Sequence, residues 1–243
     1  MNQRPSCFDR VYDVAIVGAG YAGFAAACAL ADAGHDVVLT SHDGAAVWES
    51  GRVFAPVAGA SGEPLWQQWL AELTARGGAA NGFVDGACAE ILASHWLLNR
   101  RGKLTPLHYV RPVAVERAGG LLAAVAVATK SGLRRLAARR WIDATETGEL
   151  LRLLDPALPA GRLPFCRSLH LYFQETGFAE AGELAIRWEQ DGLAASLEPT
   201  VWPNERRLTV RVPAAVADPR PRIPELVTRL REVQTLLAHR KLG

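Results

Sequence analysis

Apolar and polar residues follow one another along the start of the chain in the order expected of a strand, a helix and a second strand. A short apolar run covers residues 12–17, small and apolar residues cover 21–33, and a second apolar run covers 36–41. Glycines separate these segments, with Gly34 before the last of them. Short apolar runs bounded by glycine are typical of buried strands, and the longer segment is typical of a helix. The pattern predicts a βαβ unit.

Further along, the apolar spacing predicts two helices and then three strands. Apolar residues recur at helical intervals over 64–76 and 87–99. Runs rich in strand-forming residues follow at 107–115, 121–129 and 133–141, separated by short turns that contain glycine. Such turns predict an antiparallel three-stranded meander. The fold class indicated is α/β, a Rossmann-like parallel sheet with this meander inserted into it.

The remainder of the chain predicts a smaller and mostly β lobe. A strand over 141–145 and a helix over 149–154 precede a change of character at Pro156. Later segments predict three strands and one amphipathic helix, over 168–174, 184–188, 207–212 and 225–240. We therefore expect three parts: a dinucleotide-binding domain over 10–155, a substrate-side or interface lobe over 156–222, and a C-terminal helix over 223–243.

Composition narrows the class of protein. The 243 residues are 49% hydrophobic and 21% charged, which is typical of a globular protein. The formal net charge is only +2 and the basic residues are scattered, so nucleic acid is not an expected partner. Glycines interrupt the apolar N-terminal segment, so we expect no membrane span and a cytoplasmic protein. The four cysteines form no CxxC pair and the six histidines no metal-binding spacing, so no metal site is predicted.

The turn after the first strand carries the sequence Gly-Ala-Gly-Tyr-Ala-Gly over residues 18–23. In a dinucleotide-binding turn, Gly18 permits the sharp exit from the strand, Gly20 lets a pyrophosphate approach the backbone, and Gly23 lets the helix pack closely. The N–H groups of the helix's first turn and the positive end of its dipole then face the phosphates. The spacing therefore predicts a dinucleotide cofactor.

A second strand, turn and helix over 142–151 reads Ile-Asp-Ala-Thr-Glu-Thr-Gly-Glu-Leu-Leu. With the glycine motif and the meander before it, this order resembles the FAD-dependent oxidoreductases of the glutathione-reductase-like superfamily over about residues 10–155. The resemblance implies FAD as cofactor. It implies that the pyrophosphate is contacted by the first turn, at Gly18, Ala19, Gly20, Ala22 and Gly23. It also implies that the backbone of 112–114, which includes Val113, contacts the adenine. The second turn then closes over the cofactor with Ala144, Thr145 and Gly148. Asp143 either contacts the cofactor or caps its own turn.

Two departures from the family pattern are visible. Ser41 stands where relatives carry the acid that binds the adenosine ribose, with His42 next to it, so we expect either that cofactor binding is weakened or that Asp43 substitutes for that acid. Relatives also return to the nucleotide domain with a late glycine-containing strand and helix, which this sequence lacks after Arg207. We therefore expect either that a partner subunit or a second copy of the chain supplies these elements, or that the chain is a shortened form.

The function predicted is that of an FAD-binding oxidoreductase, or of the FAD-binding subunit of one, with hydride transfer between a small organic substrate and the flavin. No catalytic residue is assigned. Arg52, His170 and Tyr172 are candidates near the flavin ring. A non-catalytic subunit that keeps the fold for assembly is an alternative. An NAD(P)-dependent dehydrogenase is a weaker one, because the meander favours the flavoprotein plan.

Overall fold

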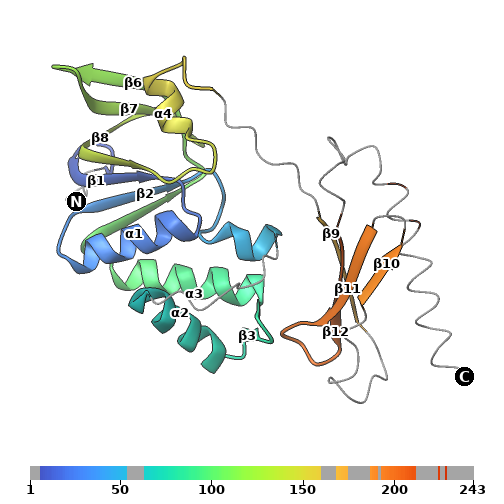
Figure 1. Ribbon diagram of the computed structural model, residues 1–243. Coiled ribbons are helices and arrows are strands. Elements are labelled where there is room, and N and C mark those ends of the chain that lie inside the picture. The colour runs from blue at the N-terminus through green and yellow to red at the C-terminus, as the bar shows by residue number, and fades with distance from the viewer. Residues whose placement is uncertain are drawn as a thin grey trace, which may run out of the picture. The chain divides into compact units, whose positions relative to one another are not determined.

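The protein is described here by a computed structural model, which covers residues 6–53, 63–159, 168–174, 187–190 and 193–211, together with Pro224 and Thr228. The chain forms two compact units, Met1–Arg162 and Leu163–Gly243. Figure 1 shows the elements of both. Within the described segments, every helix is too short or too polar to span a lipid bilayer.

Unit 1 is built on a six-stranded sheet in the order β5-β2-β1-β8-β7-β6. Strand β1 pairs in parallel with β2 and β8, and β2 pairs in parallel with β5, whereas β6, β7 and β8 pair antiparallel. The six strands are β1 (Val11–Val17), β2 (Val37–Ser41), β5 (Leu104–His108), β6 (Arg111–Ala118), β7 (Leu121–Thr129) and β8 (Gly132–Asp143). The predicted α/β fold class, a Rossmann-like sheet with an inserted meander, is confirmed.

Strand β8 belongs to both parts of the sheet. Its first half pairs with β7 as far as Ala137, and its second half, Ala137 to Asp143, pairs with β1. The sequence predicted two segments here, 133–141 and 141–145, which the structure joins into one strand. The third strand of the meander therefore leads directly into the second turn motif.

The prediction of a single strand over 107–115 was wrong. Strand β5 ends at His108 and β6 begins at Arg111. Between them Tyr109 has a φ of 58°, which turns the chain out of the extended conformation. Hydrogen bonds from the N–H of Tyr109 to Asp43, in the loop after β2, and from the N–H of Val110 to Ser41, the last residue of β2, hold this turn. The parallel strand β5 and the antiparallel strand β6 consequently lie at opposite edges of the sheet.

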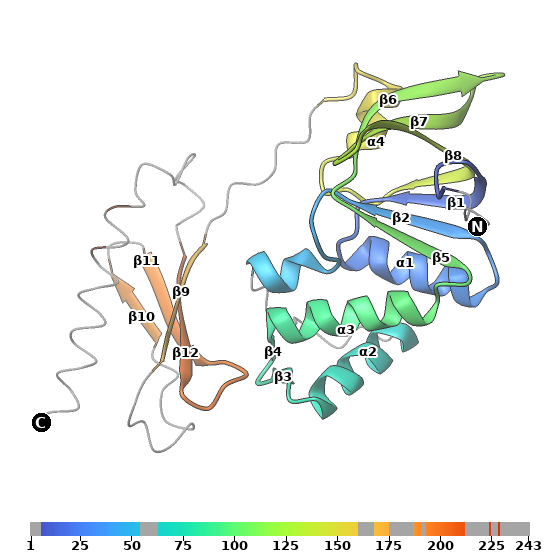
Figure 2. The ribbon, with the colours of Figure 1, turned by 180° about the vertical axis from the view of Figure 1, so that it is seen from behind.

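Helices cover both faces of this sheet. Figure 2 shows α1, α2 and α3 on one face, and α4 lies against the other beside β6. The helices and the small hairpin beside them are α1 (Tyr21–Asp32), the π-helical turn η1 (Glu49–Val53), α2 (Pro64–Ala75), β3 (Ala79–Ala80), β4 (Phe83–Val84), α3 (Gly86–Asn99) and α4 (Glu149–Leu154). Alternate residues of β1 point to the two faces, so Ile16 packs with Trp69 and α1 while Val17 packs with Leu150 of α4. This two-sided burial fixes the register of the strands whose ends carry the site.

Unit 2 contains a four-stranded antiparallel sheet in the order β10-β11-β12-β9. Its strands are β9 (Ser168–Gln174), β10 (Arg187–Gln190), β11 (Leu193–Pro199) and β12 (Glu205–Arg211). The sequence did not predict β11, and the expected strand over 184–188 overlaps β10 at two residues. The predicted helix over 225–240 lies outside the described residues apart from Thr228.

Candidate cofactor site

Two turns meet where the parallel strands β1 and β8 end. The N–H of Ala144, which follows β8, donates to the carbonyl of Val17 at 2.8 Å, and the N–H of Gly18 donates to Thr40 at 3.0 Å. Gly18 has a φ of 101°, and a Cβ atom built on it would lie 2.5 Å from the carbonyl oxygen of Ala144. Only glycine satisfies both the dihedral angle and the close approach. The first and second glycine motifs are therefore in direct contact.

Gly23 lets α1 pack onto the same turn. A Cβ atom on Gly23 would overlap the carbonyl oxygen of Gly18, so any side chain there would push the helix away from the strand. Gly20 precedes the helix with extended backbone, at φ −63° and ψ −177°, which other residues also adopt. The glycine at 20 is thus needed for space beside the backbone.

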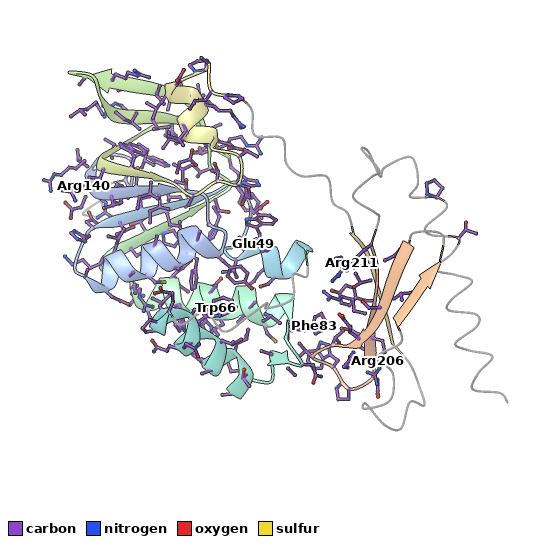
Figure 3. The ribbon with its side chains drawn as sticks, in the orientation of Figure 1. Glu49, Trp66, Phe83, Arg140, Arg206 and Arg211 are labelled. Atoms are coloured by element: carbon purple, nitrogen blue, oxygen red, sulfur yellow. The ribbon has the colours of Figure 1, made fainter. Side chains whose placement is uncertain are left out.

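The carboxylate of Glu49 fills it. Both carboxylate oxygens accept the N–H of Tyr21, the first residue of α1, at 2.9 and 3.1 Å. A Cβ atom on Gly20 would overlap Glu49 Oε1 and would lie 3.0 Å from Trp48 Nε1. Figure 3 shows Glu49, the first residue of η1, at the end of α1. An anion thus already occupies the positive end of the helix, which is where dinucleotide phosphates bind.

The loop after β2 carries Glu49 to this position. Val47 is fully buried and has a φ of 53°, which is rare and costly for a β-branched residue. Its N–H donates to the carbonyl of Ala19 at 2.8 Å, and its own carbonyl accepts the N–H of Ser50 at 3.0 Å. The side chain of Arg52, in the following turn η1, lies outside the described part of the chain. Sequence reasoning missed Glu49, although it is the only acidic residue between 44 and 62.

Burial raises the pKa of Glu49, and the nearby carboxylate of Glu146 raises it further. Hydrogen bonds from the backbone of Glu49 and of Tyr21 oppose this shift because they stabilise the charged form. Glu146 belongs to the turn after β8, whereas Glu49 belongs to η1. These two segments therefore place two acidic residues at the same end of α1.

The second turn is organised by Asp143. One of its carboxylate oxygens accepts the N–H of Thr145 at 3.0 Å and the Thr145 hydroxyl at 2.6 Å, and the other accepts the N–H of Leu151 at 2.9 Å. The Thr145 hydroxyl also accepts the N–H of Glu149 at 2.8 Å. Gly148 enters α4 with a φ of 67°. Of the two roles that the sequence left open for Asp143, the structure shows the capping role, and both of its oxygens are used for it.

The end of β2 carries Ser41, His42 and Asp43. The Ser41 hydroxyl is buried, donates to the carbonyl of Ala45 at 3.2 Å and accepts the N–H of Asp43 at 3.1 Å. Both of these hydrogen bonds are made within the loop after β2. Asp43 is 7% exposed, and its carboxylate lies 3.3 Å from Nε2 of His42. A ribose contact from Ser41, His42 or Asp43 stays a prediction.

Val113 lies in a bulge of β6. The pairing of β6 with β7 shifts register between Pro112 and Ala114, so Val113 has no partner residue in this ladder. The backbone of a bulged residue is available for other contacts. The adenine contact expected from this segment stays a prediction.

In unit 2, polar side chains gather on one face of the sheet. Arg207 lies opposite Tyr172 in the strand register and forms an ion pair of 2.8 Å with Glu198. Next to this row, Nδ1 of His170 lies 3.0 Å from the hydroxyl of Thr209. Burial lowers the pKa of His170, and the charge of Arg207 lowers it further. The candidate residues His170 and Tyr172 therefore share one polar face.

Comparison with known proteins identifies the class. The model of the FAD dependent oxidoreductase family matches residues 13–166, more than half of the chain. The chain belongs to this family, and FAD is its cofactor. No curated protein matches the sequence.

Solved structures show the same fold at low identity. PqsL, a probable FAD-dependent monooxygenase from Pseudomonas aeruginosa, is 20% identical with a TM-score of 0.58, over 86% of this chain and 62% of that one. A flavoprotein/dehydrogenase from Cytophaga hutchinsonii is 16% identical with a TM-score of 0.58, over 85% and 56%. The OxyS anhydrotetracycline hydroxylase from Streptomyces rimosus is 18% identical with a TM-score of 0.55, over 83% and 45%. The chain spans less than two thirds of the length of each.

The residues present fit FAD at the two turns. The first turn leaves Gly20 without a Cβ beside the helix N-terminus, and the first N–H of α1 already binds a carboxylate, which is a stand-in for a phosphate oxygen. The turn at Ala144 closes over the first turn from the neighbouring strand. The space beside Gly20 is taken by the carboxylate of Glu49, with Trp48 Nε1 next to it.

Proposed function

We propose that the chain is the FAD-binding part of an oxidoreductase of the glutathione-reductase-like superfamily, which transfers hydride between a small organic molecule and the flavin. The observation that carries this proposal is the contact of Gly18 with Ala144 at the N-terminus of α1, because it brings both glycine motifs to one place. When bound, FAD supplies the redox chemistry. The chain's task is to hold and orient it.

In this proposal each part of unit 1 has a defined role. The turn over 18–23 and the first N–H groups of α1 hold the pyrophosphate, as helix N-termini bind anions elsewhere. Asp43 and Ser41 serve the adenosine ribose, and the bulged backbone at Val113 serves the adenine. The polar face of unit 2, with His170 and Tyr172, is the substrate-side surface.

We also propose that a further polypeptide segment, from a partner subunit or a second copy of the chain, completes the sheet. Beyond Ala137 the outer edge of β8 pairs with no strand in the described ranges, although its other edge pairs with β1 as far as Asp143. An unpaired strand edge readily accepts another strand. Beside this edge a pocket of about 480 Å³ is lined by residues that include Leu30, Arg140 and Ile142. Figure 3 shows Arg140 at the end of α1 away from Glu49, so this pocket is not the phosphate site.

The test of FAD binding is the visible absorption spectrum of the purified protein, followed by acid release and chromatographic identification of the cofactor. We expect about one FAD per chain, either directly or after reconstitution. A colourless protein that does not bind added FAD would favour the second candidate, a non-catalytic subunit used in assembly, for which the carboxylate of Glu49 at the helix N-terminus is the supporting observation. Mass determination by light scattering, with co-purification of a partner, tests the completion of the sheet.

A further inference from the structure

We propose that the carboxylate of Glu49 and the pyrophosphate of FAD compete for the same end of α1, so that FAD binds only after Glu49 has moved away. The proposal rests on FAD binding at the first glycine turn. It makes Glu49 an internal competitor that sets the affinity for the cofactor.

The geometry carries the first step. Glu49 uses both oxygens on the N–H of Tyr21 and fills the space that a Cβ atom on Gly20 would occupy. A pyrophosphate needs that same space and the same donors. The carboxylate already shares this N–H between its two oxygens and fills the space beside Gly20, and a phosphate oxygen placed there would meet both its bulk and its negative charge, so occupation by one excludes the other.

The second step is electrostatic. Besides Glu49, the turn after β8 contributes Glu146, whose charge already raises the pKa of Glu49. From α3, a carboxylate oxygen of Glu90 lies against the backbone of Gly51, within the turn that carries Glu49. A pyrophosphate that brings two more negative charges would be repelled by these groups. Movement of Glu49 removes the nearest of them.

The third step concerns the loop. The hydroxyl of Tyr21 is hydrogen-bonded to that of Ser50, so this tyrosine holds the Glu49 turn through its side chain as well as through its backbone. The turn begins at Val47, whose φ of 53° costs free energy that an extended conformation would release. Rearrangement of residues 47–51 therefore offsets part of the cost of breaking the contacts of Glu49.

The experiment measures equilibrium binding of three probes, FAD, ADP and riboflavin, to wild type, E49A and E49Q. ADP carries the pyrophosphate without the flavin, and riboflavin carries the flavin without phosphate. We expect E49A to bind FAD and ADP about tenfold more tightly, since an anion at a helix N-terminus contributes free energy of this order. Riboflavin affinity should not change. E49Q keeps an oxygen for the N–H of Tyr21 but loses the charge. Its affinities for FAD and ADP should therefore lie between those of wild type and E49A.

The control is E116A, which removes an exposed carboxylate paired with Arg135 on the meander and should leave all three affinities unchanged. Thermal unfolding gives an independent readout. E49A should lower the Tm measured without FAD, because Glu49 contacts the N-terminus of α1 in that state. It should leave the Tm at saturating FAD unchanged, because Glu49 no longer makes that contact when FAD is bound. Weaker or equal FAD binding by both variants would overturn the competition, while FAD binding itself would stand. If neither wild type nor variants bound FAD, both proposals would fail.

Discussion

Gly18 and Ala144 are in contact at the ends of two adjacent parallel strands. A Cβ atom added to Gly18 would lie only 2.5 Å from the carbonyl oxygen of Ala144. The two residues belong to motifs that lie far apart in the sequence and that β1 and β8 bring to one edge of the sheet. Ligands of open α/β sheets bind at the carboxyl ends of the strands. In the proposed function the contact forms the floor of the cofactor site, which links the stability of unit 1 to that site.

The first prediction compares Gly18→Ala with Gly34→Ala. Both glycines have a positive φ, 101° and 92°, but a Cβ atom on Gly34 meets nothing within 4 Å. Gly34→Ala should lower the free energy of unfolding by about 1 kcal/mol, from the backbone conformation alone. Gly18→Ala should lower it by roughly 1–3 kcal/mol more, because it also overpacks the contact with Ala144. Urea unfolding of both variants measures the difference, and equal values would mean that the contact does not exist in solution.

The second prediction separates cofactor binding from folding. Gly20→Val should abolish FAD retention, because its side chain enters the space that the pyrophosphate needs. Its effect on folding should be smaller than that of Gly23→Ala, since the backbone at Gly20 is extended and the nearest atoms belong to the side chains of Glu49 and Trp48. Gly23→Ala should instead prevent stable folding, because a Cβ atom there overlaps the carbonyl of Gly18. Circular dichroism measures the folding of the Gly20→Val and Gly23→Ala variants, and flavin content measures their cofactor binding. Full flavin occupancy in Gly20→Val would refute this placement of the phosphate.

The features predicted correctly from the sequence are those that local backbone chemistry determines. Gly18 and Gly23 follow a buried strand, and each serves a turn or a close approach whose physical reason is present in the neighbouring residues, whereas the pyrophosphate approach at Gly20 stays a prediction. The meander was predictable because short glycine turns separate its strands. Strand β11 was missed because its sequence, Leu-Ala-Ala-Ser-Leu-Glu-Pro, contains few strand formers, and pairing on both edges stabilises it instead.

The contact between Glu49 and Tyr21 could not be predicted, because it depends on the path of the loop after β2. That path includes a left-handed Val47, a conformation that no propensity assigns to a β-branched residue. The break between β5 and β6 has the same origin at Tyr109, where hydrogen bonds to Ser41 and Asp43 hold a turn inside an apolar run. Tertiary contacts determine the path of the loop at Val47 and the break at Tyr109, and the local sequence indicates neither feature.

A third prediction concerns Asp143. Asp143→Ala removes the acceptor of the N–H groups of Thr145 and Leu151, so it should destabilise unit 1 by roughly 2 kcal/mol and loosen the start of α4. Hydrogen exchange should become faster at Leu151. Asp155→Ala, which loses only one exposed bond to the N–H of Ala157, is the matched control and should change the unfolding free energy by less than about 1 kcal/mol. Equal effects of the two substitutions would contradict the capping role.

The fourth prediction concerns Cys28, in the buried face of α1. Burial raises the pKa of its thiol to about 11, from 9.0. The thiolate is the nucleophile, so at pH 8 iodoacetamide should not label Cys28 in the native protein but should label it in urea, as mass spectrometry of the peptide would show. Because the folded thiol holds its proton more tightly than the unfolded one, its contribution to stability is complete below pH 9 and is lost as the pH rises towards 11. Rapid native labelling at pH 8 would mean that α1 opens from the sheet, and the Cys28→Ser variant identifies the part of the alkaline loss of stability that this thiol causes.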